Sequence, residues 1–203
     1  GESYRYAQSE RRAMSYAFSV TFNTKVLLIG IDGLMLHRAI ESGRAKTLSR
    51  LKTDSFFTEM SVDIPTVSGP SWTTILTGTT QDIHKVIDND FTNHALSKAP
   101  DLLTRAHSAH PELTTYAAAG WPPLIDPNDA GPVIATRLSD QRAGKHTIFV
   151  RDGETHGYEK IDTLVAQNAV RTIEESGPDL SFIYFCGADE ADRKSTRLNS
   201  SHT

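Results

Sequence analysis

Apolar runs alternate with amphipathic stretches along the chain and predict an alternation of strands and helices. The run KVLLIGI at residues 25–31 ends at Asp32-Gly33, a pattern typical of a parallel strand that is covered on both faces. Further strands are predicted at residues 56–62, 114–119, 146–150 and 180–185. Helices are predicted at residues 34–50, as two short pieces around Gly43, and at 72–76, 101–107 and 158–175. We therefore predict an α/β fold, a mostly parallel sheet with helices on both faces.

The composition is that of a folded domain, and it excludes several kinds of protein. Hydrophobic residues make up 38% of the 203 residues, which is enough for a real core. Cys186 is the only cysteine, which excludes an internal disulfide and a cysteine-rich zinc module. No apolar run approaches the roughly 18 residues of a membrane span. The net charge is −4 and the basic residues are scattered, so the sequence has no nucleic-acid footprint.

The two ends differ from the rest of the chain. Residues 1–24 are expected to be an N-terminal extension, and they lack the apolar region and cleavage site of a signal peptide. This leaves the compartment open. Residues 192–202 form the string DRKSTRLNSSH, which matches the translation of a common sequencing-library adapter in one frame. We therefore expect residues 192–203 to be an artefact tail and natural sequence to stop near Ala191.

Three polar residues follow or lie near the ends of predicted strands. Asp32 follows the first strand, Ser68 precedes Gly69-Pro70 and a short helix, and Asp189 follows the last strand. Because the carboxyl ends of parallel strands meet at one edge of a sheet, we expect these side chains to converge there. The N-terminus of a helix favours an alkoxide or a phosphoryl oxygen, but serine needs a base or a metal to become a nucleophile. Each residue also fits a purely structural role, as a helix cap or a solvated turn.

Four segments in order resemble the alkaline phosphatase superfamily, and most of all its type I phosphodiesterase/nucleotide pyrophosphatase branch. They are KVLLIGIDGL, PTVSGPSWTTILTG, HKVIDNDF and PDLSFIYFCGADEA. The resemblance covers residues 25–191, nearly all of the segment that we take as natural. It implies that these residues are the N-terminal part of an α/β/α-sandwich catalytic domain.

The resemblance also implies a chemistry, a hydrolase with two divalent metal ions, usually zinc, that works through a covalent phospho-enzyme. Asp32 and Asp189 match metal ligands of the family, and Ser68 matches the nucleophile, which also contacts the metal. Asn89 matches the residue whose amide steadies the phosphoryl oxygens, whereas Thr66 is the alternative nucleophile. The implied substrate is a small-molecule phosphodiester or a nucleotide.

One departure from the family pattern affects the metal site. The family has a metal-binding histidine four residues after the position of Asp189, where this chain has Arg193, a residue that cannot bind a metal. The later ligands of the family lie beyond the chain. We therefore expect the 203-residue chain to bind zinc poorly and to hydrolyse little or nothing, and its full-length parent to be active. His84 is expected to be structural.

Three alternative functions remain open at this point. An aspartate after the first strand and a helix N-terminus would equally suit a module that binds a nucleotide without hydrolysing it. A second alternative keeps the superfamily but changes the reaction, to a monoesterase, a phosphonate hydrolase or a phosphomutase. A third is a degenerate family member without activity. Phe91, close to Asn89, could stack on a base or pack locally.

Overall fold

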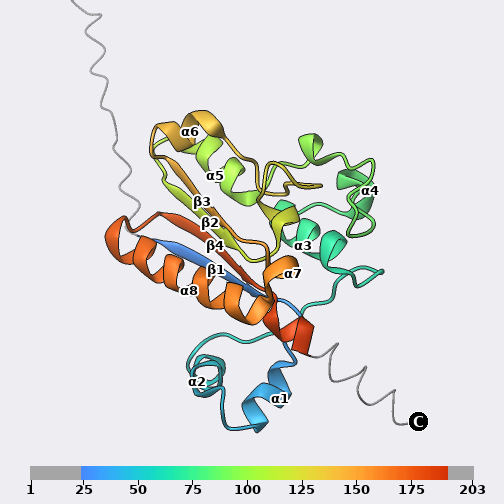
Figure 1. Ribbon diagram of the computed structural model, residues 1–203, viewed down its shortest axis with the longest axis vertical. Coiled ribbons are helices and arrows are strands. Elements are labelled where there is room, and N and C mark those ends of the chain that lie inside the picture. Colours follow the sequence, from blue (N-terminus) through green and yellow to red (C-terminus); the bar gives the residue numbers. More distant parts are fainter. Residues whose placement is uncertain (1–23, 192–203) are drawn as a thin grey trace, which may run out of the picture.

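The computed structural model describes residues 24–191 and shows a four-stranded parallel sheet (Figure 1). Its strands are β1 (Val26–Ile31), β2 (Thr115–Ala119), β3 (His146–Val150) and β4 (Leu180–Phe185). They are ordered β1-β4-β2-β3, and every neighbouring pair is parallel. All four carboxyl ends therefore lie at the same edge of the sheet. The predicted extension and the predicted tail lie outside the described residues, except for Thr24.

The connections between the strands are mostly helical. The α-helices are α1 (Leu36–Glu41), α2 (Lys46–Asp54), α3 (Ser68–Thr77), α4 (Gln81–His84), α5 (Leu102–Ala109), α6 (Leu138–Arg142), α7 (Gly153–His156) and α8 (Tyr158–Glu175). Two short 3₁₀ turns occur at Leu96–Lys98 and Pro122–Leu124. Among the described residues, no helix is both long and apolar enough to span a membrane.

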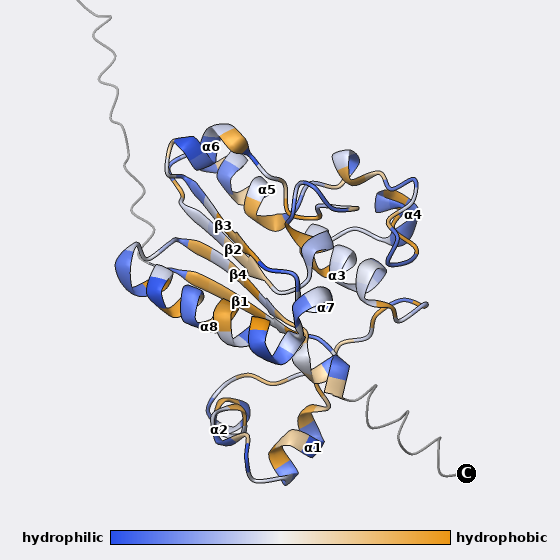
Figure 2. Cartoon of the chain, viewed as in Figure 1, coloured by the Kyte–Doolittle hydropathy of each residue, from blue (hydrophilic) through white to orange (hydrophobic). Residues whose placement is uncertain are grey.

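Apolar side chains pack on both faces of the central strands β2 and β4. On one face, the α8 residues Ile161, Val165 and Ala169 pack against β2 and β4. The other face carries the larger cluster, in which Leu76 of α3 and Leu103 of α5 pack with residues of the same two strands. The alternation of apolar and polar residues along α8 is visible as alternating colours in Figure 2. The predicted α/β fold with helices on both faces is thereby confirmed.

The strand predicted at residues 56–62 is wrong. This segment has no regular secondary structure and connects α2 to α3. Phe56 is 90% exposed and Met60 72% exposed, so the apolar residues that suggested a strand have no packing surface there. Strands are stabilised by cross-strand neighbours, and the described part of the chain provides none for this segment.

Two further expectations need correction. The first strand is not covered on both faces by the described residues, since β1 lies at the edge of the sheet and Val26, Leu27 and Ile29 are each about half exposed. The helix predicted at residues 72–76 begins earlier, at Ser68, because the proline at position 70 is tolerated in the first helical turn. It ends at Gly78, whose φ of 65° gives the expected left-handed C-cap.

A buried histidine at the start of β3 makes the stability of the fold dependent on pH. Burial, assisted by the nearby Arg137 guanidinium, lowers the pKa of His146 to about 4. The unfolded chain takes up this proton first, so stability that is present above pH ~6.5 is lost as the pH falls towards 4. We expect this residue to account for up to about 3 kcal/mol of that loss. Urea unfolding at pH 7 and pH 4 should show a smaller difference for His146→Asn than for the wild type.

The matched control is the exposed His156. This residue is exposed in the folded chain, so its replacement by asparagine shows how much of the effect comes from removing any imidazole rather than a buried one. An unaltered pH dependence in His146→Asn would contradict the prediction.

Candidate active site

Ser68 and Asp32 meet at the edge formed by the carboxyl ends of the strands. Asp32 directly follows β1, and Ser68 is the first residue of α3. The Ser68 hydroxyl donates a hydrogen bond to Oδ2 of Asp32 at 2.7 Å, although 36 residues separate the two in the sequence. Both residues are half-buried. The chain therefore holds a serine hydroxyl against a carboxylate at the N-terminus of a helix.

Asn89 is tied to the same helix N-terminus. Its Oδ1 accepts a hydrogen bond from the backbone N–H of Gly69 at 2.7 Å. A Cβ at position 69 would lie 2.4 Å from the carbonyl oxygen of Asp88, so only glycine allows this close approach. The amide nitrogen of Asn89 has no hydrogen-bond partner in the described part of the chain, and this side chain lines the same cavity as Ser68. It is free to donate to a ligand there.

Asp189 completes the group of expected residues. It lies in the short helical segment after β4, and one of its carboxylate oxygens is within 4.8 Å of a carboxylate oxygen of Asp32. Gly33 makes this approach possible, because its φ is +64° and a Cβ there would lie 2.5 Å from Cα of Asp189. The structure thus brings Asp32, Ser68 and Asp189 together from three distant parts of the sequence.

Ser68, Asn89 and Asp189 border a small acidic cavity of about 120 Å³. Its walls are formed by Ser68, Asn89, Trp121, Glu154, Tyr158, Tyr184, Cys186, Asp189 and Glu190. Three of the wall residues carry carboxylates, Asp32 lies beside them, and none of the wall residues is lysine or arginine. A phosphoryl group is anionic, so it would be repelled here unless cations lay between it and the carboxylates.

Tyr184 is a site residue that the sequence analysis missed. It belongs to β4 and is fully buried, and its hydroxyl donates to Oδ2 of Asp32 at 2.6 Å. The same carboxylate oxygen therefore accepts from both Ser68 and Tyr184. Burial and the adjacent Asp32 carboxylate raise the pKa of Tyr184, so its hydroxyl stays protonated as a donor. Its position within an apolar strand, LSFIYF, gave no sign of this polar contact.

Asp162 of α8 is a second residue that was missed. Its two carboxylate oxygens accept hydrogen bonds from the backbone N–H groups of Cys186, at 3.3 Å, and Gly187, at 2.7 Å. Burial raises the pKa of Asp162. By binding the first amides after β4, this side chain fixes the start of the segment that carries Asp189.

Three other residues considered in the sequence lie apart from this group. His84 is fully buried, with its ring nitrogens bonded to the Thr74 hydroxyl and the Val86 amide, which is a structural arrangement. Thr66 is exposed and does not line the cavity. Phe91 is only 3% exposed and packs against Trp121 with 6.1 Å between ring centroids, so it packs locally.

The donor groups fit a divalent cation. Asp32 and Asp189 offer carboxylate oxygens, which are suitable ligands for zinc, and the hydroxyl oxygen of Ser68 lies beside them. The carboxylates of the cavity wall attract a cation and would repel an unneutralised phosphoryl group. No histidine belongs to this cluster among residues 24–191. These oxygens are too few to close two four-coordinate sites.

Comparisons with known proteins agree with this fold. The solved structures that match include phosphonoacetate hydrolase from Sinorhizobium meliloti 1021, in complex with phosphonoacetate (TM-score 0.57) and with phosphonoformate (TM-score 0.56). Each is 16% identical, and the matches cover 82% and 81% of this chain but only 47% and 46% of the solved ones. The chain thus spans about half the length of these structures, and at this identity the likeness concerns the fold. A search of the curated proteins gives no match.

The family comparison covers most of the sequence. The sequence model described as type I phosphodiesterase / nucleotide pyrophosphatase matches residues 26–196, a range that includes Asp32, Ser68, Asn89 and Asp189. The chain belongs to the type I phosphodiesterase / nucleotide pyrophosphatase family.

Proposed function

We propose that this chain carries the nucleophile and part of the metal site of a hydrolase that cleaves small-molecule phosphodiesters or nucleotides. The observation that carries the proposal is the 2.7 Å hydrogen bond from Ser68 to Asp32 at the N-terminus of α3. It places a hydroxyl group at the wall of an acidic cavity, next to the helix amides that favour an anionic oxygen.

The proposed reaction has two steps. In the first, Ser68 Oγ attacks phosphorus in line, the Oγ–P bond forms, and the bond from phosphorus to the leaving oxygen breaks. The serine proton is lost, and the leaving oxygen is protonated. In the second step, water attacks phosphorus and breaks the Oγ–P bond, which restores the hydroxyl of Ser68. Asn89 donates its free amide N–H to the phosphoryl oxygens, whose charge grows in both transition states.

Asp32 and Asp189 are the proposed metal ligands, together with the oxygen of Ser68. We propose two divalent ions, zinc in the first instance, which when bound lower the pKa of a nucleophile and neutralise phosphoryl charge. The chain's own contribution is to orient Ser68 through Asp32 and to bring Asp189 beside them through Gly33.

We also propose that the 203-residue chain hydrolyses little substrate by itself. The cluster at residues 24–191 contains too few ligands for two closed sites, and position 193, outside the described residues, is an arginine. Residues 192–203 are proposed to be foreign to the natural protein. We therefore assign the activity to the protein from the uninterrupted reading frame, that is, the full-length parent in which natural sequence takes the place of residues 192–203.

Trapping of the covalent intermediate tests this proposal. The protein from the uninterrupted reading frame, supplied with zinc, is mixed with bis-p-nitrophenyl phosphate, quenched in acid and mapped by peptide mass spectrometry. We expect a phosphoryl adduct on Ser68, and none in Ser68→Ala. An adduct on Thr66 instead, or turnover that never labels Ser68, would overturn the phospho-serine mechanism.

A further inference from the structure

Cys186 contributes a third ligand atom to the group formed by Asp32 and Asp189. Its Sγ and one carboxylate oxygen from each aspartate all lie within 4.8 Å of one another. Asp32 follows β1 and Cys186 follows β4, two strands that pair directly, with Ile31 opposite Phe185. The short helical segment after β4 then returns Asp189 to the same place. The sheet itself thus sets the positions of the sulfur and of both carboxylates.

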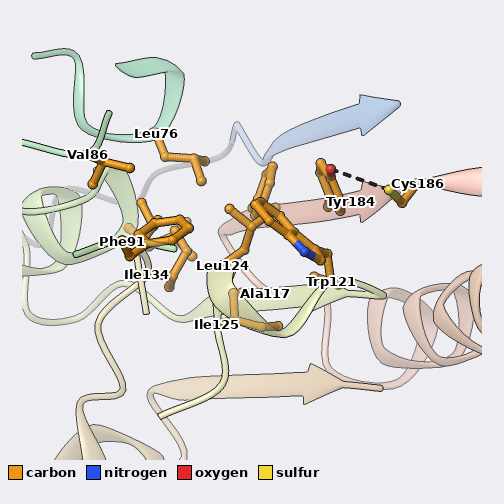
Figure 3. Close-up of a cluster of buried hydrophobic side chains, with 14 residues drawn as sticks. Leu76, Val86, Phe91, Ala117, Trp121, Leu124, Ile125, Ile134, Tyr184 and Cys186 are labelled. Carbon is orange, nitrogen blue, oxygen red and sulfur yellow. Dashed lines mark hydrogen bonds between the residues drawn. The ribbon is translucent and has the colours of Figure 1, made fainter. Parts of the chain in front are cut away.

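The thiol also lies at the wall of the acidic cavity. Cys186 is 7% exposed and lines the cavity together with Ser68 and Asp189. The Tyr184 hydroxyl oxygen lies 3.8 Å from Sγ, a long and weak contact, since its one proton is donated to Asp32 (Figure 3). Tyr158, another wall residue, also forms a hydrogen bond with the thiol, and a metal–sulfur bond would be stronger than either contact.

We infer that Cys186 is a metal ligand, so that Asp32, Asp189 and Cys186 form an O₂S site that prefers zinc-like, thiophilic ions to magnesium or calcium. This inference rests on the metal dependence in the proposed function but not on its nucleophile. When the ion binds, the thiol proton leaves to solvent and a sulfur–metal bond forms. Thiolate sulfur favours Zn²⁺ and Cd²⁺, whereas Mg²⁺ and Ca²⁺ favour oxygen ligands.

The spacing of the three atoms suits one ion. Ligand atoms about 2.0–2.3 Å from a tetrahedral zinc ion lie about 3.3–3.8 Å apart. The separations here, at most 4.8 Å, need to shorten by up to about 1.5 Å, which side-chain rotations provide. Asp162 supports the geometry, since it holds the backbone amides of Cys186 and Gly187 and so fixes the segment that carries the sulfur.

Titration of the purified, reduced 203-residue chain with Cd²⁺ alone tests the inference by ultraviolet absorption. A sulfur-to-cadmium charge-transfer band reports a thiolate–metal bond, and any such band belongs to Cys186 because the chain has no other cysteine. We expect a band that saturates at one equivalent, because the sulfur adds a third ligand to the two carboxylates on which the expectation of poor zinc binding rested. The band should be lost in Cys186→Ser and Cys186→Ala and should persist in excess Mg²⁺. Asp32→Asn and Asp189→Asn are each expected to weaken Cd²⁺ binding by about 100-fold or more.

Glu190→Gln is the matched control, since Glu190 lines the cavity but is not among the three clustered residues. It should change Cd²⁺ affinity far less than the two aspartate variants. Far-ultraviolet circular dichroism establishes that each variant is folded. Cd²⁺ binding without the band, absence of binding, or a band that is insensitive to both aspartate variants would each overturn the inference.

The cadmium titration and an assay of hydrolysis together separate this inference from the proposed function. A cadmium–thiolate band in a protein whose hydrolysis does not depend on Ser68 would support the O₂S site and overturn the phospho-serine mechanism. Hydrolysis that requires Ser68, with no thiolate band, would support the phospho-serine mechanism and overturn the O₂S site. Cys186 would then be a buried packing residue.

Discussion

Replacing Ser68 by alanine is expected to lower kcat for phosphodiester hydrolysis by about 10⁴-fold or more, because the variant has no oxygen to form the covalent intermediate. The measurement is steady-state release of p-nitrophenol from bis-p-nitrophenyl phosphate by the protein from the uninterrupted reading frame. Substrate binding should change much less than kcat, since the cavity walls and Asn89 remain in place.

Two variants control for this prediction. Thr66→Ala should retain activity within a few fold, because Thr66 is exposed and lies outside the cavity wall. Ser68→Thr keeps a hydroxyl group at the same position and should keep part of the activity. Equal losses in Thr66→Ala and Ser68→Ala would transfer the nucleophilic role away from Ser68.

Replacing Gly33 by alanine is expected to lower the stability of the fold strongly. Two effects add at this position. Its φ of +64° disfavours a side chain by about 1–2 kcal/mol, and the new Cβ would lie 2.5 Å from Cα of Asp189, which adds about 1–3 kcal/mol of overpacking. Urea unfolding should therefore show a decrease of about 2–5 kcal/mol in the free energy of unfolding.

Gly43 separates the two effects. Its φ is +70°, but no atom lies within 4 Å of the Cβ that alanine would add. Gly43→Ala should therefore show the backbone cost alone, about 1–2 kcal/mol. Equal destabilisation by the two substitutions would show that the contact between Gly33 and Asp189 has no energetic weight.

The regular elements of the fold could be predicted wherever the sequence pattern was long or bounded by clear signals. The stripe of apolar residues at helical spacing predicted α8 with its bounds, and the apolar run LSFIYF after Gly177-Pro178 predicted β4. The strand predicted at residues 56–62 was wrong, because an apolar segment forms a strand only when the edge of a neighbouring strand is available. That edge is a tertiary feature which no local pattern contains.

The sequence predicts the site residues at the ends of strands but not those that act through long-range hydrogen bonds. Strand ends in an α/β sheet point to one edge, and this reasoning led to Asp32, Ser68 and Asp189, which the structure brings together. Tyr184 and Asp162 could not be found in this way. Each acts through a hydrogen bond to a residue far along the chain or to a backbone amide, and a polar atom within an apolar run gives no periodic signal.

The pairing of β1 with β4 also determines when this site can form. Asp32 and Tyr184 are 152 residues apart, and the hydrogen bond between them exists only once the last described strand has inserted between β1 and β2. Such non-local contacts are slow to form, because a long loop must close before any interaction compensates its entropy. During synthesis, a nascent chain that has extended through α8 contains Asp32 and Ser68 but not the strand that aligns them. Assembly of the site is therefore a late event in folding.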